Sequence, residues 1–159
     1  MAGGTPQADA IAAEMRRSVE KQAIALVLDL VKALMRATPV DTGHARRNWF
    51  ASIGQPVTVE SDEGAGAANA AVTGYKLEMG PLWVANPVDY VVFLNYGSSK
   101  KAAAGWIETT VMQVLQRAKE RSSSGGLDVA GIQTGFADLV GGGGAENLAS
   151  AYSPFGDEA

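Results

Sequence analysis

The strongest hydrophobic pattern in the chain lies near its start, over residues 5–37. Large apolar side chains recur there every three to four positions, and charged residues fall largely between them. This spacing predicts one long amphipathic helix, since an α-helix turns once in ~3.6 residues. Thr5 suits the N-cap, Pro6 suits the first turn, and Pro39 forces Thr38 out of the helical conformation. We expect the apolar face to pack on a core or on a neighbouring subunit; it comprises Ile11, Met15, Val19, Leu26, Leu30 and Leu34.

A second amphipathic helix is predicted over residues 105–121, which repeat the same spacing before a change in composition. The segments between the two helices are short. Residues 88–96 are ambiguous between strand and helix, and Asn86 as a cap with Pro87 at the first position favours a helix. The other expected elements are short helices at residues 44–47 and 67–75, and strands at residues 48–53, 57–60 and 82–85. We expect most of the aromatic residues between the helices to lie in the core, and some to anchor a subunit interface.

Residues 122–159 differ in composition from the rest of the chain. Serine and glycine at 122–126 and four glycines at 141–144 are typical of linkers. A pure spacer would not need the apolar residues found with them, which are Leu127, Val129, Ile132, Phe136, Leu139, Val140, Tyr152 and Phe155. The pattern predicts one compact domain over residues 1–121. A Gly/Ser-rich extended arm follows over residues 122–159, held by a neighbouring subunit.

Composition narrows the possible chemistry. The 159 residues include no cysteine and one histidine, so disulfides, thiol nucleophiles and cysteine- or histidine-rich metal sites are excluded. A formal charge of −4 argues against tight, sequence-specific nucleic-acid binding. It does not argue against a channel lining that DNA passes without binding tightly. No apolar run approaches the ~20 residues of a membrane span, and no secretory signal is visible, so we expect synthesis in the cytoplasm.

The sequence gives little support for catalytic groups. His44, Asp41 and Ser52 can be drawn as a hydrolase triad, but no glycine pattern of a nucleophile elbow surrounds a serine. The four-glycine run lacks the lysine and hydroxyl residue of a phosphate-binding loop. We therefore predict no catalytic residue, no metal and no cofactor.

Two adjacent basic pairs lie between the two predicted long helices, Arg46 with Arg47 and Lys100 with Lys101. One interpretation places them in solvated loops or in ion pairs between subunits. The other places them against DNA phosphates in a channel, where contacts are nonspecific and sensitive to salt. The sequence leaves both open for Arg47, Lys100 and Lys101.

Two segments together resemble a known family. Residues 38–49 read TPVDTGHARRNW, and residues 86–106 read NPVDYVVFLNYGSSKKAAAGW. Their order and spacing, between two amphipathic helices, resemble the tail-completion or neck proteins of HK-type and lambda-like tailed bacteriophages. The resemblance covers residues 10–119. Asn95 stands where these proteins often have a glutamate, and Ala104 where they commonly have a proline.

The resemblance implies an α+β subunit in which the two long helices pack on a small, mostly antiparallel sheet. It also implies a non-enzymatic virion protein, assembled in the host cytoplasm, that forms a ring around the DNA path. A hexamer is favoured because phage tails are six-fold, and a dodecamer would match the portal. Its neighbours would be portal-side adaptor or head-closure proteins and the tail terminator or tail tube. Asp41, Thr42 and Gly43 would form the helix-to-strand turn. The sheet–helix junction or the subunit interface would be shaped by Arg46, Trp49, Tyr90, Tyr96, Gly97 and Ser98.

Two other functions stay open. The chain can be the tail terminator itself, which caps the tail tube in the same kind of particle. A different class is a small cellular binding module with a C-terminal arm.

Overall fold

The computed structural model describes residues 4–40, 43–98, 100 and 102–125. The predicted arm therefore lies outside the described residues from position 126 onward, and so do Asp41, Thr42 and Lys101. A boundary between two units of the chain falls between Leu115 and Gln116, and the fold below is that of the first unit.

The first element is the long helix α1, Pro6–Ala37. The Thr5 side chain accepts a hydrogen bond from the Ala8 amide at 3.4 Å, as an N-cap does. The helix ends at Thr38, whose φ of −62° and ψ of 122° are the extended values that a following proline imposes. The predicted helix is confirmed at both ends.

The sheet has two antiparallel strands. Strand β1 (Phe50–Ile53) pairs with β2 (Leu82–Ala85), with Phe50 opposite Ala85 and Ile53 opposite Leu82. The predicted α+β class, with helices on a small antiparallel sheet, is confirmed. The strand predicted at residues 57–60 is wrong: this segment forms no strand, and Val59 is 74% exposed. The alternating pattern alone does not form a strand, because no strand among the described residues pairs with this segment.

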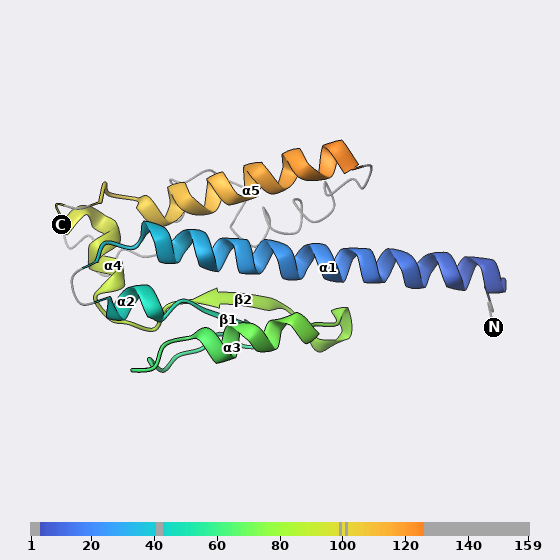
Figure 1. Cartoon of the computed structure of the whole chain (residues 1–159), viewed down its shortest axis with the longest axis horizontal. Coiled ribbons are helices and arrows are strands. Elements are labelled where there is room, and N and C mark those ends of the chain that lie inside the picture. Colours follow the sequence, from blue (N-terminus) through green and yellow to red (C-terminus); the bar gives the residue numbers. More distant parts are fainter. Residues whose placement is uncertain (1–3, 41–42, 99, 101, 126–159) are drawn as a thin grey trace, which may run out of the picture. The chain divides into compact units, whose positions relative to one another are not determined.

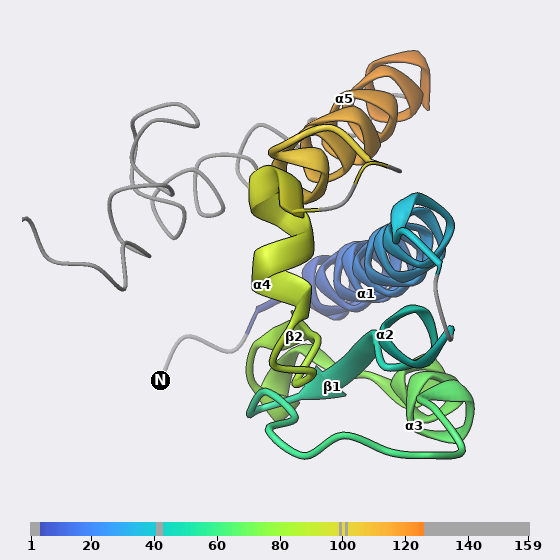
Figure 2. The same ribbon diagram turned by 90° about the vertical axis from the view of Figure 1, so that its left-hand side faces the viewer.

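The two-stranded sheet lies between two helical layers (Figures 1 and 2). Helix α1 packs on β1 and β2, and α3 (Gly66–Ala71) packs on β1 and continues into the 3₁₀ turn Val72–Gly74. The Asn69 amide pairs with the β1 backbone: its Oδ1 accepts from Ala51 N at 2.6 Å, and its Nδ2 donates to Trp49 O at 2.9 Å. Side-chain pairing of this kind occupies backbone groups that β2 does not reach.

The remaining helices connect and extend this core. They are α2 (His44–Arg47), the 3₁₀ turn Leu77–Met79, α4 (Val91–Phe93) with its π-helical continuation Leu94–Ser98, and α5 (Trp106–Gly125). The ambiguous segment is helical, as predicted, but begins at Val91. Asn86 Oδ1 accepts from Val88 N at 3.1 Å and closes a turn ahead of the helix. Helix α5 runs on through serines predicted as linker, because serine costs a helix little.

The core gathers around the C-terminal half of α1. Its buried residues are Leu30, Val31, Leu34, Ala45, Trp49, Ala51, Val72, Val88, Val91, Trp106 and Val114. Some of the aromatic residues expected in the core are instead exposed, by 38 to 61%: Trp83, Tyr90, Phe93 and Tyr96. The prediction did not say which aromatic residues lie in the core; the structure buries Trp49, Phe50 and Trp106 and leaves these four exposed.

Candidate assembly site

The two segments that resemble the phage family meet through a pair of tryptophans. Trp49, from the first segment, and Trp106, from the second, lie edge to face with ring centroids 6.3 Å apart and planes 85° apart. Such a pair adds about 0.5–1.5 kcal/mol beyond the burial of its surface. Both residues are buried, at 5% and 6% exposed. The structure therefore brings together segments that the sequence separates by more than fifty residues.

The hydroxyl of Thr38 links the end of α1 to this tryptophan pair. Trp49 Nε1 donates to Thr38 Oγ1 at 2.9 Å, and that hydroxyl donates to Leu34 O at 2.6 Å. Thr38 is 1% exposed, so water cannot replace either bond. The residue that ends the helix thus also orients the central tryptophan.

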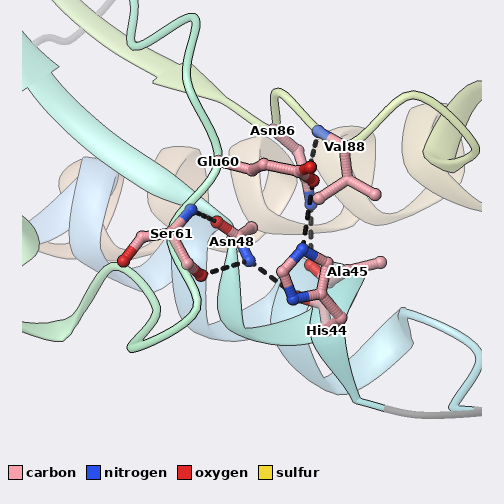
Figure 3. A network of polar contacts seen from close by, with 7 residues as sticks. All are labelled: His44, Ala45, Asn48, Glu60, Ser61, Asn86 and Val88. Atoms are coloured by element: carbon pink, nitrogen blue, oxygen red, sulfur yellow. Dashed lines mark hydrogen bonds and ion pairs between the residues drawn. The ribbon is translucent and has the colours of Figure 1, made fainter.

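Asparagine side chains hold the turn after α2 (Figure 3). Asn48, fully buried, donates through Nδ2 to His44 O and to Ser61 O, both at 3.0 Å. Its Oδ1 accepts from Ser61 N at 2.7 Å. Asn86 Nδ2 donates to Ala45 O at 2.8 Å, which connects the second segment to the first. Amide side chains suit this position because each supplies both donors and an acceptor to backbone groups.

Asn95 connects the π-helical turn to the start of α5. Its Oδ1 accepts from Ile107 N at 2.9 Å, and its Nδ2 lies 2.9 and 2.8 Å from the two carboxylate oxygens of Glu108. Asn95 is 4% exposed, and Gly105 N donates to its backbone oxygen at 2.6 Å. The amide here donates to Glu108, which a glutamate at the same position could not do in its charged form.

The motif residues proposed from the resemblance occupy different environments. Gly43 has a φ of 80°, a conformation that favours glycine, and precedes α2. Arg46 is partly buried, and its Nε has no hydrogen-bond partner among the described residues. Tyr90 and Tyr96 are 42% and 46% exposed. Gly97 and Ser98 lie in the π-helical turn.

Within the two basic pairs, Arg47 and Lys100 are exposed. Their side chains are therefore accessible to a partner, as both interpretations of the basic pairs require. The prediction of a DNA-channel or intersubunit role stays a prediction.

Two apolar surfaces of the first unit are exposed. The first is the α1 stripe, defined by Ile11 and Met15, which are 60% and 56% exposed. The second is the aromatic patch, defined by Tyr90, Phe93 and Tyr96, with Phe93 61% exposed. Large aromatic and methionine side chains are enriched where proteins bind one another. The helical spacing indicated the α1 stripe, whereas the exposure of the aromatic patch had no signal in the sequence.

Glu20 marks the point at which α1 becomes covered. Its carboxylate accepts from Leu77 N at 3.1 Å and from Lys76 Nζ at 3.2 Å. The backbone hydrogen bond from Leu77, helped by the Lys76 ammonium, holds the pKa of Glu20 below its ordinary value although burial acts to raise it. Before Glu20, every residue from Pro6 to Arg17 is exposed except Ala13.

The single histidine makes a surface contact. His44 Nε2 lies 3.0 Å from Glu60 Oε2, and the Glu60 side chain is 55% exposed (Figure 3). Within the described part of the chain, no group of three or more acidic or histidine side chains is arranged to hold a metal ion. No helix among the described residues is long and apolar enough to cross a membrane.

Comparison of the chain with protein-family models, with curated proteins and with solved structures finds no match.

Proposed function

We propose that this chain is a structural, non-enzymatic subunit of the neck of a tailed bacteriophage. In this proposal it forms a ring between the DNA-filled head and the tail, as a neck or tail-completion protein. Its partners are copies of itself, the portal-side adaptor or head-closure proteins, and the tail terminator or tail tube. The hexamer is the favoured ring and the dodecamer the second.

The observation that carries the proposal is apolar surface left uncovered on the first unit. Ile11, Met15 and Phe93 are each at least 56% exposed, although the helices that carry them also supply core residues, Leu34 in α1 and Val91 in α4. Exposed clusters of large apolar side chains are typical of surfaces that bind other proteins. The junction of Trp49 with Trp106 adds support, because the residues of both family-like segments build one packed unit.

The electrostatics of the chain fit passive passage of DNA. A net charge of −4 repels phosphates overall, so a ring of such subunits would not hold DNA tightly. The exposed Arg47 and Lys100 can supply weak, salt-sensitive contacts or intersubunit ion pairs.

A null mutation of the gene in the parent phage tests the proposal. We expect DNA-filled heads and free tails that fail to join, and restoration of infectivity when purified chain is added to the extract. Quantitative mass spectrometry of wild-type virions should find the chain at ring stoichiometry. Absence of the chain from purified virions would contradict the proposal and favour the cellular binding module.

The same mutant separates the neck ring from the tail terminator. Loss of a neck ring should leave tails of uniform length, because the tail tube is still capped. Loss of a terminator should give tails of irregular length. Electron micrographs of the mutant lysate distinguish the two.

A further inference from the structure

The side of α1 that faces away from the sheet carries a row of basic residues. Arg17, Lys21, Lys32 and Arg36 follow one another at intervals of four, eleven and four residues, each close to a whole number of helical turns. They therefore lie within ~100° of one another around the helix axis and extend over about 28 Å along it. All four residues are exposed. We call this row the basic ridge.

The core lies on the opposite side of the same helix. Leu34 is 1% exposed, and it follows Lys32 by two residues, which is a rotation of ~200° around the helix axis. Strands β1 and β2 pack against α1 from one side (Figure 2). The basic ridge therefore faces solvent and is separate from the packing that holds the first unit together.

The surface around the basic ridge has a single sign of charge. Over residues 16–59, every exposed charged residue that the structure describes is basic. The two acidic residues of α1 in this range are withdrawn from the surface: Glu20 is buried and accepts from Leu77 N at 3.1 Å, and Asp29 is half-buried. Soluble surfaces ordinarily intersperse both signs of charge, whereas a face of one sign attracts a partner of the opposite sign.

The charges of the basic ridge are also largely uncompensated. In the described part of the chain, Lys21, Lys32 and Arg36 make no ion pair. Arg17 lies 3.7 Å from Glu14, in a pair that is largely exposed and therefore weak. These four cations are available to a negatively charged partner.

The length of the basic ridge fits a rod-like polyanion. Duplex DNA carries a negative charge every ~1.7 Å along its axis, so about 28 Å corresponds to roughly eight base pairs. A protein loop with acidic residues is shorter. The exposed acids Glu60, Asp62 and Glu63 lie within four residues, which span ~14 Å at most. Charge and length together favour DNA over such a loop.

We propose that the basic ridge of α1 contacts the phosphates of duplex DNA along the DNA path of the ring. The contacts are independent of sequence, because phosphates carry no base information. The net charge of −4 keeps the attraction local and weak, so the DNA is guided without being held. The inference rests on the proposed function for the presence of DNA, but the contact itself can be tested on the purified chain.

Salt-dependent binding of the full-length chain to duplex DNA tests the contact. The probe is a labelled duplex of about 30 base pairs, or three helical turns, followed by fluorescence anisotropy. Lys21→Gln combined with Lys32→Gln should weaken binding at low salt at least about tenfold. It should also reduce the slope of log affinity against log salt by about two, one for each lost phosphate contact. Two unrelated DNA sequences should lose affinity equally.

The matched control is Arg47→Gln combined with Lys100→Gln, which removes the same charge from exposed positions outside the basic ridge. The control should lose less affinity and keep more of the salt slope. An equal loss in both variants indicates a general charge effect, and a larger loss in the control places the DNA contact at the basic pairs. Either result overturns the proposal, and so does a parent chain without measurable affinity at low salt.

A charge reversal in the phage separates DNA from an acidic protein partner. Virions with Lys21→Glu and Lys32→Glu should still join heads to tails, because the basic ridge contacts DNA and not a neighbouring subunit. Failure to join, with an unchanged urea midpoint of the purified variant, would assign the ridge to an acidic protein surface and overturn the proposal. If the ridge fails these tests while the chain is present in virions at ring stoichiometry, the proposed function stands without it.

Discussion

At the scale of single residues, asparagine amides hold the described unit together. Asn48, Asn69, Asn86 and Asn95 each bond to the backbone of a segment far from their own in the sequence. None of these bonds could be predicted from the hydrophobic pattern, because a polar residue between elements indicates a loop and does not name its partner. An unpaired buried amide costs free energy, so the buried Asn48 and Asn95 require these bonds, while Asn69 and Asn86 are partly buried.

The hydroxyl of Thr38 provides the first test. In Thr38→Val the Trp49 indole N–H is left buried without its acceptor, whereas Leu34 O still accepts from the backbone N–H of residue 38. We expect a loss of about 1–3 kcal/mol in the free energy of unfolding, measured by urea denaturation. Thr38→Ser keeps the hydroxyl and should lose less; an equal loss in both variants would contradict this role for the hydrogen bond.

Asn95 provides the second test, through its contact with Glu108. In Asn95→Asp two carboxylates face each other at hydrogen-bond distance, and a donor to Glu108 is lost. We expect a destabilisation of about 2–3 kcal/mol at neutral pH, measured by urea denaturation.

Acid should reduce the Asn95→Asp loss, because one of the two carboxyl groups is then protonated. Adding Glu108→Gln to Asn95→Asp restores a donor facing the new carboxylate and should recover most of the lost stability. Failure of the double variant to recover would contradict the role of the Asn95–Glu108 contact in the loss seen for Asn95→Asp.

At the scale of elements, the long helices were predictable and the connections were not. The limits of α1 follow from Thr5 and Pro39, which act locally on the backbone. The strand predicted at residues 57–60 failed because a strand needs a partner, which a local pattern does not show. Of the candidate site, the sequence indicated which residues matter but not that Trp49 and Trp106 pack inward while Tyr90 and Tyr96 point outward.

The attachment of α1 to the segment before β2 should depend on pH. Because the pKa of Glu20 is lowered in the folded chain, the unfolded chain binds protons more readily as the pH falls. Stability from this group is present above its ordinary pKa and is lost as the pH falls through the folded value, in the range below about pH 5.

Glu20→Gln should flatten the dependence of the unfolding free energy on pH in that acidic range. The matched control is Glu14→Gln on the same helix, whose side chain is 73% exposed beside Arg17. It should keep the pH dependence of the parent chain. Equal curves for Glu20→Gln and the parent would show that another group governs the acid response.

At the scale of the whole molecule, the fold and the proposed assembly place different demands on the chain. Among the described residues the core extends to Val114, and we expect the first unit to fold without the arm. The arm was predicted to serve a neighbouring subunit. Truncation of the arm therefore tests assembly separately from folding of the first unit.

Deletion of the residues after Ser124 should leave the domain folded, with an unchanged urea midpoint and circular dichroism spectrum. It should impair the joining of heads to tails, measured as infectivity in a complementation assay. His44→Ala serves as the control, since the imidazole contacts the largely exposed Glu60 side chain and its loss should leave infectivity close to normal. Full infectivity of the truncated chain would remove any role for the arm in assembly.

The contact of Trp49 with Trp106 also has a consequence for how the first unit melts. The end of α1, the start of β1 and the start of α5 all converge on this one pair of rings. Loosening any of these elements exposes the other two, so intermediates that keep only part of the unit gain little. Heat should therefore open it in a single cooperative step, and tryptophan fluorescence should change in step with the loss of helix.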